Sequence, residues 1–280
     1  MENLDVFESV FKRAVREPFH YSLPTLKNVL IVTDTKNAEL CDSVQTWLKD
    51  HPLFKDATWA CVDGSTYDNW ADLSNIIESA PASLVVTHRL LKETHETKRY
   101  SLGSYLDMMT QASSCPVLLL PTDDAKALPS TPLDSVLAVA DHLSGHDALV
   151  NHAAAFTRPK GKLTLCHLED EDVFNYYIET IERVPEINST VAREKIKKQL
   201  LAAPAHYIES VSKSLKDERP DLGVEAVVEI GHIIDRYRDL IGKHSAGLLV
   251  LESKDDTQLA MHGLGYSLAV EFQKTPILLL

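Results

Sequence analysis

Short, continuous apolar runs that end in an aspartate mark two similar places along the chain. Residues 28–34 read NVLIVTD and residues 135–141 read SVLAVAD. An apolar run of this length, without polar alternation, is typical of a parallel strand buried on both faces of its sheet. A polar turn and a helical pattern follow the aspartate in both places. The hydrophobic pattern therefore predicts that the chain contains a repeated unit.

A helix and a second strand are predicted after each of these first strands. Apolar residues between positions 40 and 48 recur at the spacing of one helix face, and those between 149 and 156 do so more weakly. New apolar runs follow at residues 58–62 and 163–168. Strand, helix and strand at this spacing predict a βαβ unit with a right-handed crossover in both halves.

The two repeated segments also close alike. Residues 83–86 and 247–251 are apolar runs that predict one more buried strand each. A polar loop, a short helix and a last apolar run, at 117–120 and 277–280, follow in both halves.

The spacing within these closing segments is the same. Gly103 precedes Pro116 by thirteen positions, and Gly263 precedes Pro276 by thirteen positions. Each last run would be an uncovered apolar edge in its own half, which is an aggregation hazard. We therefore expect the two last strands to pair with each other around a pseudo-twofold axis, as an intramolecular pseudo-dimer.

The halves are unequal in length. The second contains a long amphipathic insert and a third strand at 224–228, and the first has neither. The predicted organisation is an N-terminal helical extension (1–27), a shortened first domain (28–121), a linker (122–133) and a second domain (134–280) with a helical insert at about 171–218.

Composition excludes several classes of partner. The 280 residues include 28 basic and 41 acidic ones, so the net charge of −13 repels a nucleic-acid backbone. The apolar runs are too short to cross a bilayer, and the first residues lack the basic start of a signal peptide. The four cysteines form no CxxC pair, and Cys61 and Cys166 fall in apolar runs, where a thiol behaves as a small hydrophobic group. We expect a cytoplasmic protein with reduced cysteines and with no nucleic-acid partner and no membrane span.

The second half carries the clearest resemblance to a known family. LGVEAVVEIG at residues 222–231, an amphipathic helix, and AGLLVL at 246–251 follow in order, and residues 102–104 and 114–118 supply a closing pattern in the first half. This series resembles the universal stress protein family, in its tandem form, over nearly all of residues 28–280. The resemblance implies an α/β fold of two tandem doubly wound parallel-sheet domains, adenine nucleotide alpha hydrolase-like, related by a pseudo-twofold axis.

The resemblance also implies a ligand crevice at the carboxyl ends of the strands. In nucleotide-binding members the aspartate after the first strand lies near adenosine, and a glycine-rich loop with a helix N-terminus holds the phosphates. An aspartate at a strand end is equally common as a turn or cap residue. The implied cofactor-binding residues are Thr33, Asp34, Val62, Gly103, Ser104, Ala140, Asp141, Leu168 and Gly263.

The phosphate loop departs from the family pattern in both halves. Where the first two glycines are expected, the first half has Thr87 and Leu90, and the second has Glu252 and Asp255. A leucine side chain prevents close backbone approach, and a carboxylate about 4 Å from a phosphate repels it by a few kcal/mol. The sequence therefore argues against ATP or AMP as a cofactor, most strongly in the second half.

Basic residues in the first of these loops leave two interpretations open. Lys92, His95, Lys98 and Arg99 raise the local positive charge, so an anion could bind there. Charged residues in a loop are more often simply solvated, and a solvated loop is the preferred interpretation.

Histidines suggest a metal site only weakly. His142, His146 and His152 are close in sequence, and His167 ends the neighbouring predicted strand. Zinc needs three or four converging ligands, and the turn around Gly145 does not provide helical spacing. No metal site is predicted. No catalytic residue is predicted either, because no nucleophile or oxyanion donor accompanies these residues and no GxSxG or Walker pattern occurs.

Three functions follow from these observations. The preferred one is a cytoplasmic, stress-associated protein with a degenerate nucleotide site that binds a small ligand, either a nucleotide or an apolar molecule, or a protein partner. The second is an ATP-binding member with weak hydrolysis that uses the first half. The third is a structural or interaction module whose crevices are filled by its own side chains. Phe174, Tyr176 and Tyr177 in the insert separate the first from the third, according to whether they line an open pocket. Association into a homodimer is a further expectation.

Overall fold

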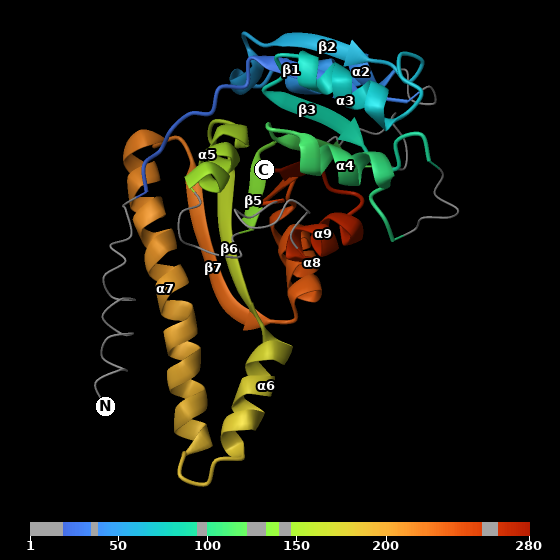
Figure 1. The fold of residues 1–280 in the computed structure, drawn as a ribbon. Coiled ribbons are helices and arrows are strands. Elements are labelled where there is room, and N and C mark those ends of the chain that lie inside the picture. The colour runs from blue at the N-terminus through green and yellow to red at the C-terminus, as the bar shows by residue number, and fades with distance from the viewer. Residues whose placement is uncertain (1–18, 35–38, 94–99, 122–132, 140–146, 254–262) are drawn as a thin grey trace, which may run out of the picture.

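The computed structural model describes residues 19–34, 39–93, 100–121, 133–139, 147–253 and 263–280 (Figure 1). These residues form one nine-stranded sheet in the order β2-β1-β3-β4-β9-β8-β5-β6-β7. Every neighbouring pair of strands is parallel except β4 and β9. Helices lie on both faces of the sheet, so the chain is an α/β protein with a mostly parallel central sheet, as predicted.

The strands lie where the apolar runs predict them. Their bounds are β1 Asn28–Val32, β2 Thr58–Val62, β3 Leu84–His88, β4 Val117–Leu120, β5 Ser135–Val139, β6 Lys162–Asp170, β7 Gly223–Gly231, β8 Leu248–Leu251 and β9 Ile277–Leu279. β6 and β7 each have nine residues and extend beyond the apolar runs that indicated them, because their last residues pair with each other past the body of the sheet.

The helices follow the predicted amphipathic periods. Their bounds are α2 Leu40–Leu48, α3 Trp70–Ser79, α4 Ser104–Ala112, α5 Asp147–Phe156, α6 Glu171–Glu182, α7 Ser189–Glu218, α8 Ile233–His244 and α9 Gly263–Glu271, with a short 3-10 turn, η2, at Pro52–Phe54. The predicted insert is thus two helices. None of the helices in the described part of the chain combines the length and the apolar content needed to span a membrane.

The two halves of the sheet have related strand orders. We call residues 28–120 the first half and residues 135–280 the second half. β1 lies between β2 and β3, and β5 lies between β6 and β8, so the strand order reverses beside the first strand of each half. β7 and α7 have no counterpart among the described residues of the first half, so β2 is an edge strand. The domain boundaries themselves remain a prediction.

The halves meet at the centre of the sheet through their last strands. β4 and β9 are antiparallel, with Val117 opposite Leu279, Leu118 opposite Leu278, and Leu119 opposite Ile277. All of these side chains are buried. The prediction that the last strands pair with each other is confirmed, and neither apolar strand is an exposed edge.

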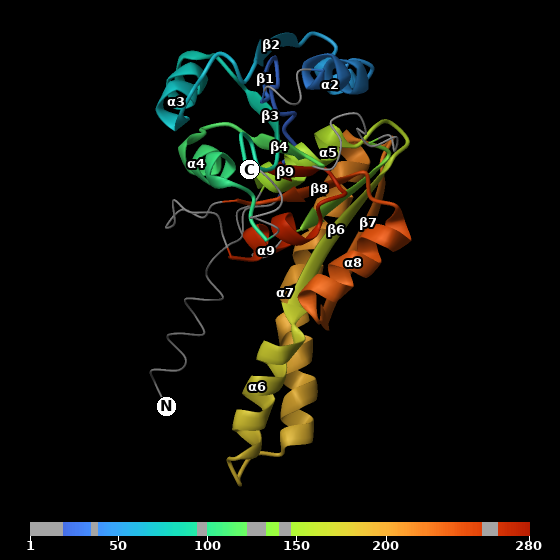
Figure 2. The same ribbon diagram turned by 90° about the vertical axis from the view of Figure 1, so that its right-hand side faces the viewer.

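Two apolar layers cover the sheet, one on each face. One layer contains buried residues of α2, α5 and the C-terminal part of α7, and the other contains buried residues of α3, α4, α8 and α9. Each layer includes strands from both halves, so the apolar core is continuous across the β4–β9 junction. Figure 2 shows α3 and α4 separated from α2 and α5 by the sheet.

The expectation of four reduced cysteines is wrong for two of them. Cys41 of α2 and Cys61 of β2 form a disulfide, with their Cα atoms 6.1 Å apart. Cys61 lies on an edge strand and is exposed, rather than enclosed in a central strand, and α2 packs close enough to reach it. Cys115 and Cys166 are free, and burial raises the pKa of the Cys166 thiol, which makes it a poor nucleophile.

Candidate functional site

The carboxyl ends of β1 and β3 lie side by side and hold the first group of predicted site residues. Thr33 and Asp34 directly follow β1, and Thr87 and His88 end β3. Both ends meet at one edge of the sheet because the strands are parallel. Asp34 is only 4% exposed and Thr33 is completely buried, so these two residues lie beneath other parts of the chain.

The polar groups at and around Thr33 form hydrogen bonds with neighbouring residues. Its amide nitrogen donates to the carbonyl of Val62 (3.0 Å), which extends the β1–β2 ladder by one residue. Its carbonyl accepts a hydrogen bond from the Tyr67 hydroxyl (3.0 Å). Thr87 Oγ1 donates to the carbonyl of Val32 at the same distance. The structure therefore uses these groups to hold the strand ends together.

Asp34 faces His88. Asp34 Oδ1 lies 3.8 Å from His88 Nε2, and both side chains are buried. His88 Nδ1 is 2.8 Å from the carbonyl of Arg89, so Nδ1 carries a proton and donates it to that oxygen. The strand-end aspartate predicted to face a ligand thus faces a histidine of the next strand.

The loop after β3 packs directly against the glycine at the start of α4. Leu90 and Lys92 have left-handed backbones (φ 54° and 57°), and the amide of Leu90 donates to the carbonyl of Leu102 (2.9 Å). Gly103 has φ 96°, and a Cβ atom placed on it would lie 2.9 Å from the Leu90 Cα. Only glycine fits at this position, and its free space is filled by the chain's own backbone.

Glu93 closes the N-terminus of α4. Its Oε1 accepts hydrogen bonds from the backbone nitrogen of Ser104 (3.1 Å) and from the Ser104 hydroxyl (2.6 Å). A helix N-terminus with free amides is a common site for a phosphate. Here a carboxylate of the chain occupies that position, so Gly103 and Ser104, which the resemblance implies as ligand-binding residues, meet an internal anion.

Lys92, which belongs to the loop with the predicted basic residues, contacts Tyr67 of the same half. Its Nζ donates to the carbonyl of Tyr67 and lies 4.1 Å from the centre of the Tyr67 ring. Burial, with a smaller effect from the Asp34 charge, raises the pKa of Tyr67, so the phenol stays protonated. The other three basic residues of that prediction, His95, Lys98 and Arg99, lie outside the described residues.

Arg89 is a residue of this region that the sequence did not indicate. It is 3% exposed, and Nη2 donates to the carbonyl of Phe272, just after α9 (3.4 Å). Its Nε and Nη1 have no hydrogen-bond partner within the described chain. Burial lowers the pKa of Arg89 to about 10, which still leaves a charged guanidinium at neutral pH. The only sign of this residue in the sequence is that an arginine directly follows a buried strand, and such an arginine is equally compatible with an exposed loop position.

The corresponding region of the second half is described only in part. Ala140 and Asp141 lie outside the described residues, as does Asp255. Leu168 is buried within β6, and Gly263 begins α9.

Polar residues at the strand ends of the second half are paired within it. His167 Nε2 lies 2.9 Å from Glu169 Oε1, and Ser253 Oγ donates to the carbonyl of Leu280 (2.5 Å). His142 and His146 of the metal hypothesis are outside the described residues, and the described ones contain no group of three metal-ligating side chains.

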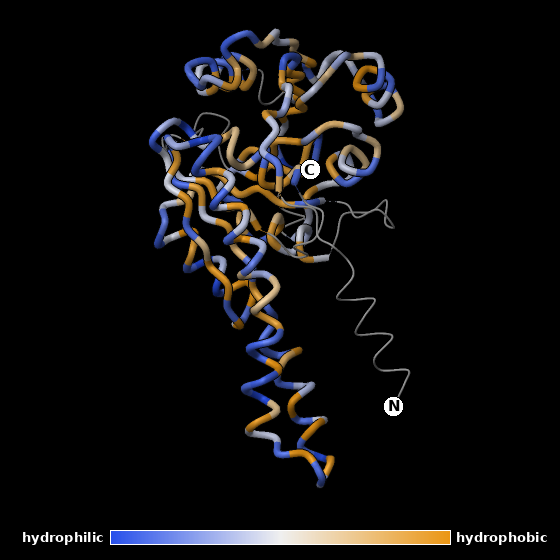
Figure 3. Tube along the Cα trace, turned by 90° about the vertical axis from the view of Figure 1, so that its left-hand side faces the viewer, coloured by the Kyte–Doolittle hydropathy of each residue, from blue (hydrophilic) through white to orange (hydrophobic). Residues whose placement is uncertain are grey.

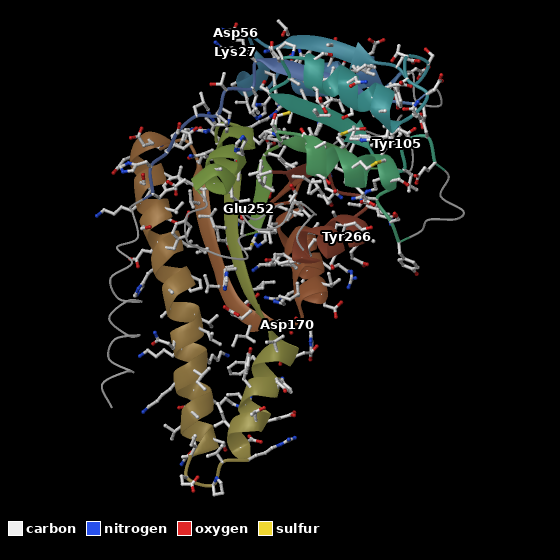
Figure 4. All side chains as sticks on the ribbon, in the orientation of Figure 1. Lys27, Asp56, Tyr105, Asp170, Glu252 and Tyr266 are labelled. Atoms are coloured by element: carbon white, nitrogen blue, oxygen red, sulfur yellow. A yellow bond between two sulfur atoms is a disulfide. The ribbon has the colours of Figure 1, made fainter. Side chains whose placement is uncertain are left out.

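An apolar groove is present where the insert leaves the sheet. It has a volume of about 270 Å³. Its lining residues are Glu169, Asp170, Val173, Phe174, Tyr177, Ile181, Ile196 and Leu200. Two of the three aromatic residues singled out from the sequence therefore line it. Tyr176 does not, because it lies one residue before Tyr177 and so points about 100° around the helix from it. Figure 4 places Asp170 at the point where the body meets α6.

Comparisons with known proteins give similarities of fold at low identity. No protein-family model and no curated protein matches the chain. A functionally unknown protein from Pseudomonas aeruginosa PAO1 is 14% identical over 92% of this chain and 93% of its own, with a TM-score of 0.49. A putative universal stress protein from Pseudomonas aeruginosa UCBPP-PA14 gives 14% identity, 92% and 94% coverage and a TM-score of 0.49. A universal stress protein from Archaeoglobus fulgidus DSM 4304 is 13% identical over 90% of this chain and 84% of its own, with a TM-score of 0.47.

Solved structures similar to this chain thus include universal stress proteins, the family that its sequence resembles. Their TM-scores are below 0.5, so the function has to be argued from the residues of the chain itself.

Proposed function

We propose that this chain is a regulatory protein of the universal stress protein type, built from two tandem domains, in which the nucleotide site of the first domain is closed by the chain's own side chains. It acts by binding a partner or a small ligand elsewhere on its surface. The proposed domains are those expected from the sequence, 28–121 and 134–280, joined by a linker.

One observation carries this proposal. The Glu93 carboxylate accepts both the backbone and the side-chain hydrogen bond of Ser104 at the start of α4. A phosphate at this helix terminus would have to displace the carboxylate, and the two negative charges would repel each other at close range. The negative net charge of the chain adds to the same effect.

The surroundings of Glu93 support this interpretation. Leu90 fills the space above Gly103, and Asp34 faces His88 beneath the surface. In the second half, Glu252 stands where a phosphate-loop glycine is expected, and a carboxylate there disfavours a triphosphate.

Removing the internal carboxylate tests the proposal. We expect wild-type protein to show no 1:1 ATP complex by native mass spectrometry and calorimetry at micromolar concentrations. Glu93→Ala frees the Ser104 amide, so we expect affinity for inorganic pyrophosphate to rise at least about tenfold. Glu78→Ala, at an exposed site on α3 of the same half, is the matched control and should change nothing.

Two results would overturn the proposal. One is a stoichiometric ATP complex of the wild-type protein, which would favour the ATP-binding alternative. The other is a Glu93→Ala variant that folds normally and binds pyrophosphate no better than the control.

A further inference from the structure

α6 and α7 form a hairpin that projects from the body of the molecule (Figures 1 and 2). The apolar stripe of α7 runs from Leu215 and Ile208, which are buried in the core on one face of the sheet, to Leu200 and Ile196, which are only half-buried. These last two residues line the apolar groove together with residues of α6. Figure 3 shows hydrophobic positions continuing along the hairpin beyond the sheet. The groove is therefore an extension of the core's apolar stripe past the sheet.

One side of the groove is open to solvent. Val173 and Tyr177 line it, although they are 50% and 56% exposed. The other side of the hairpin is occupied by Arg193, which lies 5.6 Å from the centre of the Phe174 ring and donates to Asn175 Oδ1 (3.1 Å). Asn175 precedes Tyr177 by two residues and lies about 160° around α6 from it. A ligand can therefore enter the groove on the side of Val173 and Tyr177.

The end of the groove nearest the sheet is acidic. Glu169 and Asp170, the last residues of β6, line it where the body meets α6 (Figure 4). Glu169 Oε1 lies 2.9 Å from His167 Nε2, and Asp170 Oδ1 accepts hydrogen bonds from the amides of Asp172 and Val173. A carboxylate has about four acceptor positions on its two oxygens, so both groups can accept further hydrogen bonds.

The other groups of the groove do not balance this negative charge. None of the described residues that line it is basic, and its polar side chains are the two carboxylates and the Tyr177 hydroxyl. Lys195 and Lys198 lie about 140° and 160° around α7 from Leu200, so they point away from the groove. Pro204 has no N–H, so the carbonyl of Leu200 lacks its usual helical donor and adds another acceptor. The groove thus offers apolar walls and an acidic, hydrogen-bond-accepting end.

We propose that this groove binds a small molecule with an apolar body and an ammonium head. The head donates hydrogen bonds to Glu169 and Asp170, and such charge-assisted bonds are the strong ones. The body lies along Tyr177 and Ile196, and the aromatic ring of Tyr177 also attracts a cation. The net charge of −13 raises the local concentration of cations. This inference rests on the proposed function, in which a ligand binds away from the strand ends of the first half, and it names the class of that ligand.

The size of the groove favours a small molecule over a segment of another protein. Its volume of about 270 Å³ lies just below the range of about 300–1,000 Å³ that is typical of pockets for drug-sized ligands. A stable protein interface involves about 20–30 residues on each side, whereas eight residues line the groove. From Asp170 to Ile181 the lining residues of α6 span about 16 Å, so an alkylammonium such as decylammonium can lie along them.

Three probes with the same alkyl chain separate the head from the body of the ligand. Decylammonium, 1-decanol and decanoate are titrated into the full-length protein by calorimetry, each below the concentration at which it forms micelles. We expect saturable 1:1 binding of decylammonium, at least about tenfold tighter than that of 1-decanol, with decanoate weaker still. Equal affinities for decylammonium and decanoate would overturn the proposal, and so would the absence of saturable decylammonium binding at about millimolar concentration.

Paired variants test the acidic end and the apolar wall. The double variant Glu169→Gln, Asp170→Asn removes both charges, while the amides can still bond to His167 and cap α6. It should weaken decylammonium about tenfold and leave 1-decanol unchanged. Tyr177→Ala should weaken both probes about tenfold, because it removes part of the wall. The matched control is Tyr176→Ala, at a more exposed neighbour that does not line the groove, and it should change neither.

Circular dichroism checks that each variant is folded, and two further results would contradict the proposal. One is an equal response of decylammonium binding to Tyr176→Ala and Tyr177→Ala, which would place the ligand outside the groove. The other is a groove that fails to bind decylammonium but binds a lysine-rich amphipathic peptide through Tyr177, which would make it a protein docking surface. Neither result bears on the pyrophosphate measurements with Glu93→Ala, so the failure of this inference and the failure of the proposed function are distinguishable.

Discussion

The two halves of the sheet share a strand order but differ in what lies beside their second strands. β2 of the first half is an edge strand with three of its five residues exposed, whereas β6 of the second half lies between β5 and β7 and has six of its nine residues buried. The shorter half is held by local constraints instead. Its edge strand is covalently joined to α2 by the Cys41–Cys61 disulfide, and Glu93 caps α4. The first half is thus stabilised by local links, whereas the second half is stabilised by additional burial of apolar side chains.

The halves also differ in how they use equivalent glycines. Gly103 and Gly263 stand at the starts of α4 and α9, thirteen residues before equivalent prolines. Gly103 has a positive φ and lies against the Leu90 backbone, whereas a Cβ atom on Gly263 would meet no atom of the described residues within 4 Å. The same residue type at an equivalent position is therefore a packing requirement in one half and not in the other.

Breaking the strand pair that joins the halves should have the largest effect. Leu119 is completely buried and lies opposite Ile277 in the β4–β9 pair. Leu119→Lys places an unpaired charge in the core, so we expect a loss of about 4 kcal/mol or more in the free energy of unfolding, measured by urea denaturation. Tyr176→Lys, on the exposed side of α6, is the control and should change it by less than about 0.5 kcal/mol. A Leu119→Lys protein as stable as the control would show that this junction does not hold the halves together.

A second contact between the halves should make stability depend on pH. His51 Nε2 donates to the carbonyl of Phe156 (2.9 Å), and burial lowers the pKa of His51 to about 4 from an ordinary value near 6.5. Between these two values the unfolded chain binds a proton that the folded chain does not, so stability falls as the pH is lowered from 6.5 to 4. We expect this residue to contribute about 2–3 kcal/mol of that fall. Below pH 4 and above pH 6.5 the contribution of His51 to stability should no longer change with pH.

His51→Asn isolates this contribution. The Asn side chain can still accept from the Leu53 amide, as His51 Nδ1 does, but it does not titrate. Urea midpoints measured from pH 4 to 7 should therefore vary less in the variant than in the wild type. Identical pH profiles would mean that groups other than His51 account for the dependence, such as His152 and His244, whose pKa values burial also lowers.

The smallest expected effect sharpens the comparison of the two glycines. Gly103→Ala requires a left-handed alanine whose Cβ atom meets the Leu90 Cα at 2.9 Å, so we expect a loss of about 2 kcal/mol in stability. Gly263→Ala places its Cβ atom at a helix start where no described residue lies within 4 Å, and should change stability by less than about 0.5 kcal/mol, or increase it. Thermal unfolding of both variants measures the difference. Equal losses would mean that the two loops are packed alike.

The sequence predicted the strands and helices well because this type of sheet has a clear pattern. Parallel strands covered on both faces need continuous apolar runs, as at residues 28–32 and 135–139, and few other structures produce them. The β4–β9 pairing was also predictable. The last strand of each half is apolar and would be an exposed edge of that half unless it paired with another strand.

Features that depend on three-dimensional packing could not be predicted in this way. The Cys41–Cys61 disulfide joins residues 20 positions apart, on a helix and a strand whose distance is set by packing. The cap from Glu93 to Ser104 requires the left-handed turns at Leu90 and Lys92, which are unusual for these residue types. The sequence therefore showed no sign of the groups that fill the strand ends of the first half, and the ligand-binding roles of the implied site residues stay predictions.

The central position of β9 has a consequence for the order in which the fold forms during synthesis. β9 begins at residue 277 and is synthesised after every other strand of the described sheet, whereas β4 ends at residue 120. At about 5–20 residues per second, the strand that joins the two halves of the sheet follows β4 by roughly 8–30 s. During that interval β4 presents an unpaired apolar edge, which is open to pairing with another nascent chain, and β8 adds a second such edge only near its end. Slow synthesis or crowded polysomes should therefore favour aggregation of this protein, and a chaperone that covers strand edges should have its greatest effect before the last strand emerges.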